Sequence, residues 1–167
     1  MYENYIVING KKAELTEEQL KQLGIEVELK RNNPFGRVKN DEIYYYFEST
    51  DVIGSSPECS LGIDDNRFCA SIYFNDRDFA TQVMLHQRLY RKLLKYAYDH
   101  EAEDCEWNNG YNHHYYIYFH YKFNRFTIAP TALYKNFCVY FSSAKVAEQA
   151  IEDVIQPFMK EHPEFVW

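Results

Sequence analysis

The first stretch with a clear hydrophobic pattern begins at Ile43. Apolar and polar positions alternate over residues 43–48 and again over 68–74, which is typical of half-buried strands. A shorter strand is expected between them at residues 52–53, and an exposed loop follows it. From Asp76 to Asp99 the apolar side chains recur at helical intervals. The pattern predicts a three-stranded antiparallel meander followed by one helix, with Asn75 as the helix N-cap.

A second stretch repeats this order of elements. Residues 115–121 alternate, a short strand is expected at 125–128, and residues 137–141 alternate again. Helical spacing then runs from about 143 to 155, and Ser142 is suited to cap that helix. The two stretches match in the order of their elements, in their N-cap residues and in the side chains that share a strand face. This match predicts that the chain contains two pseudo-repeats of one unit.

The expected organisation is therefore an α+β protein in three parts. Residues 1–25 form a β-hairpin–helix module, because Asn9-Gly10 suits a tight turn and Thr16-Glu17-Glu18-Gln19 fits a capping box. Residues 26–41, rich in basic and turn-forming residues, are predicted to be a linker. The main α+β domain is expected over 42–167, with its repeats at about 43–99 and 114–157.

Composition adds an unusual aromatic content to this picture. The chain has 16 Tyr, 12 Phe and 2 Trp, and a formal net charge of −7. An acidic chain argues against general binding of duplex nucleic acid and favours a partner with a basic surface. The sequence lacks an apolar run of membrane-spanning length, and its four cysteines form no CxxC pair, which predicts a cytoplasmic protein with free thiols.

The tyrosines gather on one face of the predicted sheet. If the helices cover the opposite face, these side chains form a surface that can stack on bases or anchor a protein partner. An equally simple alternative is that they fill the second face of a packed sheet. The candidate ligand- or partner-binding residues are Tyr44, Tyr46, Glu48, Arg67, Tyr73, Tyr116, Tyr118, His120, Arg125 and Tyr140.

Catalytic and metal-binding patterns are weak. His114 and His120 lie roughly 20 Å apart on an extended strand, and the sequence has no zinc-ligand spacing. The cysteines sit in no nucleophile motif, and there is no Gly-rich phosphate loop. We therefore expect no catalytic residue, no metal and no cofactor.

Several segments, taken in order, resemble a group of small uncharacterised proteins encoded by phages and prophages of Gram-positive bacteria. The segments that carry the resemblance are Ile8-Asn9-Gly10, residues 15–20, 33–38 and 44–47, Asp65-Asn66-Arg67-Phe68, Tyr140-Phe141-Ser142-Ser143 and residues 157–163. The resemblance implies a small accessory protein that counteracts host defence, and it implies no catalytic residue.

These observations lead to a hypothesis about function. The chain is expected to be a non-enzymatic, anti-CRISPR-like protein that binds and inhibits a nucleic-acid-handling defence effector in the host cytoplasm. The first alternative is a sponge that sequesters a small nucleotide immune signal, and the second is an enzyme of nucleotide or phosphate chemistry. Exposed strand edges would also allow a homodimer.

Overall fold

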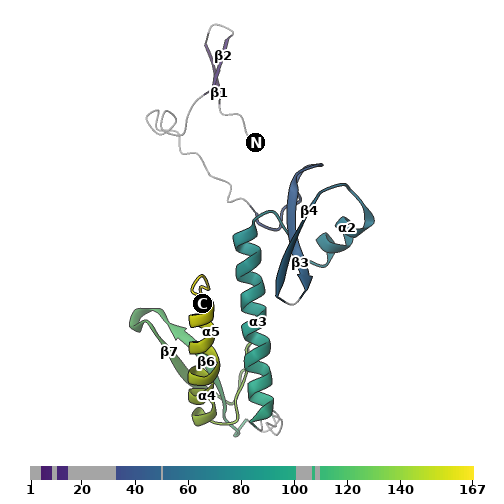
Figure 1. Cartoon of the computed structure of the whole chain (residues 1–167). Helices are drawn as coiled ribbons and strands as arrows, with labels where there is room; N and C mark the ends of the chain where they lie inside the picture. The colour runs from purple at the N-terminus through teal and green to yellow at the C-terminus, as the bar shows by residue number, and fades with distance from the viewer. Residues whose placement is uncertain (1–4, 9–10, 15–32, 50, 101–106, 108–109) are drawn as a thin grey trace. The chain divides into compact units, whose positions relative to one another are not determined.

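The computed structural model describes residues 5–8, 11–14, 33–49, 51–100, 107 and 110–167 (Figure 1). The chain divides into two compact units, residues 1–33 and 34–167. The first unit contains the antiparallel strands β1 (Tyr5–Ile8) and β2 (Lys11–Glu14), in which Ile8 pairs with Lys11. The strand pairing predicted there is confirmed. The predicted turn residues and the predicted helix of this module lie outside the described residues, as do residues 26–32 of the predicted linker.

The second unit begins with a three-stranded antiparallel sheet. Strand β3 (Ile43–Ser49) lies in the centre, between β4 (Val52–Pro57) and the short β5 (Tyr73–Phe74). Because β5 pairs with β3 and not with β4, the sheet is not the predicted meander.

The chain between β4 and β5 forms a helix, α2 (Gly62–Cys69), where an exposed loop and a strand were predicted. The carboxylate of Asp64 accepts the backbone N–H groups of Cys59 and Leu61, at 3.2 and 3.0 Å. An acid in the first turn that bonds orphan N–H groups stabilises a helix start. The alternation over residues 68–74 was therefore misleading for most of its length.

The long helix α3 (Arg77–Asp99) agrees with the helix predicted from spacing. Its buried side chains recur every four or five residues, as one apolar stripe requires. The predicted cap was wrong by one position: Asp76 accepts the N–H of Phe79 at 3.0 Å, whereas the Asn75 amide donates to the carbonyl of Gly36.

The second half contains a two-stranded antiparallel hairpin, β6 (His114–His120) and β7 (Arg125–Thr131). A 3-10 turn over Tyr121–Phe123, η2, joins the strands. The third strand predicted at 137–141 is reduced to one bridge between Tyr115 and Phe141. The segment bonds locally instead, since Cys138 N–H donates to the carbonyl of Asn136.

The C-terminal helical segment consists of α4 (Ala144–Ala150), a π turn η3 (Ile151–Ile155) and α5 (Gln156–Glu161). Ser143, and not the predicted Ser142, caps α4 by accepting the N–H of Val146 at 3.2 Å. Pro157 lies in the first turn of α5, where its missing N–H is tolerated. The wider π turn before it lets the helical path continue.

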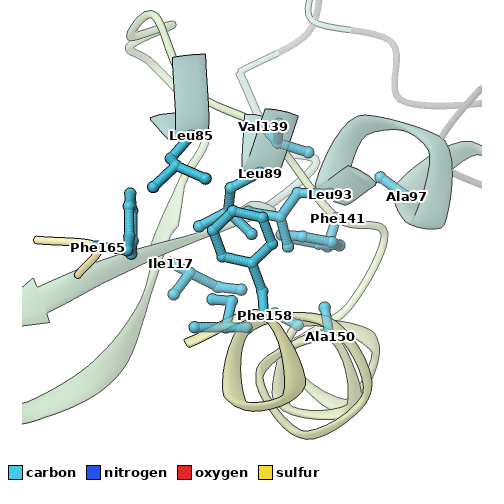
Figure 2. Close-up of a cluster of buried hydrophobic side chains, with 12 residues drawn as sticks. Leu85, Leu89, Leu93, Ala97, Ile117, Val139, Phe141, Ala150, Phe158 and Phe165 are labelled. Carbon is cyan, nitrogen blue, oxygen red and sulfur yellow. The ribbon is translucent and has the colours of Figure 1, made fainter. Parts of the chain in front are cut away.

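One hydrophobic core joins α3 to β6, α4 and α5 (Figure 2). Figure 2 shows the Phe158 ring reaching from α5 toward Leu89 and Leu93 of α3. The mixed α+β class is confirmed. Two equal three-stranded repeats are not found among the described residues, because α2 occurs in the first half alone and the second sheet has two strands. No helix in the described ranges is long and apolar enough to span a membrane.

Candidate functional site

The tyrosine face of the first sheet is covered. Tyr44 is 0% exposed and Tyr73 is 1% exposed, and their rings stack with centroids 4.0 Å apart. The edge of Phe68, from α2, packs against Tyr73 at 5.5 Å. The expectation of an open face is therefore wrong for Tyr44 and Tyr73, because α2 forms where a loop was expected.

Asp64 is the hydrogen-bond acceptor at the Tyr44 side of this covered face. The Tyr44 hydroxyl donates to the Asp64 carboxylate at 2.6 Å, and Arg67 Nη1 donates to the Tyr44 oxygen at 2.6 Å. The hydrogen bond from Tyr44 lowers the pKa of Asp64, helped by the two backbone N–H donors. Burial, followed by that same hydrogen bond, raises the pKa of Tyr44.

Glu58 holds the other end and is almost completely buried. Arg37 donates to both of its carboxylate oxygens at 2.9 Å, a bidentate geometry, and Tyr73 donates to it at 2.9 Å. The Arg37 hydrogen bond lowers the pKa of Glu58. Burial and the hydrogen bond to Glu58 raise the pKa of Tyr73 to about 12. Both buried acids are paired, and neither carboxylate has an oxygen without a partner among the described residues.

Tyr46 and Arg67 are also engaged with each other. The Arg67 guanidinium lies 3.4 Å from the centroid of the Tyr46 ring, and that ring lies over Gly54, where an added Cβ would approach it to 2.7 Å. Arg67 therefore packs on two tyrosines, Tyr44 and Tyr46. Of the candidates in this half, Glu48 alone is exposed.

The second tyrosine face has a different environment. We call it the β6–β7 outer face, and it comprises His114, Tyr116, Tyr118 and His120 on β6 with Arg125, Thr127, Ala129 and Thr131 opposite them on β7. The helices that contact this hairpin pack on its other face, where Ile117 and Ile128 join the core. Tyr116, Tyr118 and His120 remain half-buried, and Arg125 is exposed.

The aromatic rings of this face form a continuous series. Ring centroids are 6.1 Å apart between Tyr116 and Tyr118, and 6.3 Å apart between Tyr118 and His120. Tyr140 packs edge-on against Tyr116 at 6.1 Å, as its predicted position beside this face implied. Burial raises the pKa of Tyr140 to about 12, so its hydroxyl stays protonated near neutral pH. The structure thus places Tyr116, Tyr118, His120 and Tyr140 together.

Two residues that sequence reasoning did not select complete this end of the face. Trp107 stacks flat on His114, with centroids 3.7 Å apart and planes 5° from parallel. His114 is 0% exposed, and neither of its ring nitrogens has a hydrogen-bond partner within the described part of the chain. Burial lowers the pKa of His114, and the nearby Lys135 and His113 lower it further. The period-2 pattern could have identified His114, whereas no pattern marks Trp107.

A second polar atom on this face is also buried without a partner. The Thr127 hydroxyl, opposite Tyr118, has no hydrogen bond to any described residue. Buried polar groups are almost always paired in native proteins, so an unpaired one identifies an unusual position. The β6–β7 outer face contains two such groups. On the covered face, by contrast, the buried acids Glu58 and Asp64 both have hydrogen-bond partners.

Metal chemistry finds no support in the described ranges, where no three His, Cys, Asp or Glu side chains come close enough to hold an ion. No family model, curated protein or solved structure matches this chain.

Proposed function

We propose that this protein acts by binding, and that the β6–β7 outer face is its contact surface. The observation that supports this most strongly is the row of half-exposed rings, Tyr116, Tyr118 and His120, on the side of the hairpin away from the core. Tyrosine gives large, rigid contact area together with a hydroxyl, which suits it to interface positions.

The proposed partner is a host defence protein, as the resemblance to phage-encoded proteins implies, and the charge of this chain favours one that handles nucleic acid. Such effectors present basic surfaces to phosphate backbones. A chain with a net charge of −7 complements a surface of that kind and is attracted to it at long range. Arg125, which pairs with His120 across the hairpin, would place a positive charge on this face of an otherwise acidic protein.

The decisive experiment compares phage plating on a host with an active defence system, with and without this protein. We expect the wild-type protein to restore plating and the Tyr116→Ala/Tyr118→Ala double variant to lose that effect. Tyr98→Ala, which removes an exposed tyrosine from α3, is the matched control and should behave as wild type. Full protection by the double variant would contradict the proposal.

A second candidate function is sequestration of a small nucleotide signal. The unpaired His114 nitrogens and Thr127 hydroxyl favour it, because a ligand with donors and acceptors that displaced the Trp107 ring could satisfy them. Calorimetric titration with mononucleotides and cyclic dinucleotides tests this candidate. Stoichiometric uptake without turnover supports it, turnover indicates an enzyme, and absence of heat leaves protein antagonism.

A further inference from the structure

We infer that the protein has a second binding site, a cavity for a small neutral planar molecule between α3 and the segment Phe137–Phe141. The cavity has a volume of about 260 Å³. Its lining comes from α3, β6, this segment and Trp167. The site lies on the core side of the hairpin, so it is independent of the function proposed for the β6–β7 outer face.

The floor of the cavity is preformed. Leu89, Leu93, Ile117, Val139 and Phe141 are all buried in the core and come from three different elements, as Figure 2 shows. Leu89 and Leu93 are fixed on a packed helix and Ile117 on a strand, and such side chains hold a site better than side chains on mobile loops. An engineered apolar cavity of roughly 150 Å³ is enough to bind benzene. The space here therefore accommodates a ring system larger than one benzene ring.

The charge of the lining indicates a neutral ligand. No Lys, Arg, Asp or Glu is among the described side chains that line the cavity. Burial raises the pKa of Cys138, so its thiol stays protonated and adds no charge at neutral pH. An ion entering this site would lose its hydration without meeting an opposite charge. Among the lining residues, His86, Tyr90, Cys138 and Trp167 carry polar side-chain atoms, which suits a molecule with one hydrogen-bonding group.

The ring of Phe137 indicates that the ligand is planar. Phe137 and Tyr90 have nearly parallel rings, 5° apart, with centroids separated by 5.9 Å. Phe137 is nevertheless 97% exposed, so its ring makes almost no close contact with Tyr90 or any other group. A flat aromatic molecule in the cavity would cover part of both rings and remove apolar surface from water.

Indole is the probe that tests this inference, because it is neutral, flat and bicyclic with one N–H donor. We expect indole to shift the NMR methyl signals of Leu89, Leu93, Ile117 and Val139. Phe137→Ala should weaken indole binding about fivefold, the typical worth of one aromatic contact. Its fold should be unchanged, because the ring it removes touches almost nothing. Tyr134→Ala removes a comparably exposed ring from the same loop and should bind indole as wild type does.

A second measurement uses the Cys138 thiol as a reporter. In a variant with Cys59, Cys69 and Cys105 replaced by serine, bound indole should slow alkylation of Cys138. Two results would overturn the inference. One is an unchanged set of cavity methyl signals at saturating indole, and the other is equal affinity of Phe137→Ala and the wild-type protein. Shifts confined to the β6–β7 outer face would overturn it as well, and would support the surface proposed for function.

Discussion

The two tyrosine faces of residues 34–167 began as equivalent predictions and differ in the structure. On β3 and β5, Tyr44 and Tyr73 lie beneath α2, and their hydroxyls bond the buried acids Asp64 and Glu58. On β6, Tyr116 and Tyr118 are half-buried, and the helices pack on the opposite side of their hairpin.

The comparison separates two uses of the same residue type. Where a buried acid accepts each hydroxyl, Asp64 from α2 and Glu58 from the segment after β4, tyrosine serves as a core residue with a polar end. Where the neighbouring polar groups His114 and Thr127 have no described partner, the face retains bonding capacity. A structural role is expected to show in stability measurements, and a binding role in affinity measurements, so the two faces can be tested against each other.

The largest expected difference comes from truncating one tyrosine on each face. Tyr44→Ala should lower the free energy of unfolding by about 4 kcal/mol, because it removes a fully buried, stacked ring. Tyr118→Ala should lower it by about 1 kcal/mol, since its ring is half-buried. Urea denaturation of both variants measures the two values. Losses of equal size would remove the distinction between the faces.

The next effect concerns the buried acid of the covered face. Glu58→Ala should destabilise the protein by about 3 kcal/mol at pH 7, because Tyr73 and the Ser60 N–H lose this acceptor and Arg37 is left with Asp65 alone. The exposed Glu48, changed to Ala on the adjacent strand, is the control and should shift stability by less than about 0.5 kcal/mol.

The same pair of variants gives a pH test with a defined sign. The folded-state pKa of Glu58 lies below its ordinary value of 4.5, chiefly through Arg37. Its contribution is therefore fully present above pH 4.5 and is lost as the pH falls through the folded-state pKa. Urea midpoints measured from pH 7 to pH 3 should bring wild type and Glu58→Ala together in acid. A difference that stays constant over that range would contradict the role given to the Arg37–Glu58 pair.

The sequence predicted the features that depend on periodicity. The long helix α3, the strands β3, β6 and β7, and the sharing of faces along β6 all follow from spacings of 3.6 and 2 residues. The boundaries of α3 were predicted to within one residue at its start.

The features that depend on tertiary contacts were not predicted. Helix α2 has a polar sequence, and its position depends on Asp64 meeting Tyr44, a residue 20 positions earlier in the chain. The segment predicted as a last strand bonds within itself, except for the bridge from Tyr115 to Phe141. Local patterns carry no information about partners of this kind, and so the sequence left open whether a tyrosine face is covered and could not show that the two faces differ.

The smallest expected effect, and the one opposite in sign, lies at His114 on the β6–β7 outer face. His114→Phe should raise the free energy of unfolding by about 1 kcal/mol, because it removes two buried nitrogens without partners and keeps a flat ring against Trp107. His120→Phe, on the same face but half-buried, is the control and should change stability little.

The pH dependence of this variant has its own window, which distinguishes it from the effect at Glu58. The pKa of His114 is lowered from 6.5 by burial, and by Lys135 and His113, so the folded protein resists protonation of this ring. The unfolded chain then binds more protons, and wild type should begin to lose stability as the pH falls below 6.5. The gain from His114→Phe should therefore grow between pH 7 and pH 5, while the loss from Glu58→Ala is still constant. A gain independent of pH in this range would mean that the His114 ring is solvated or hydrogen-bonded. The polar groups of the β6–β7 outer face would then be as well hydrogen-bonded as those of the covered face.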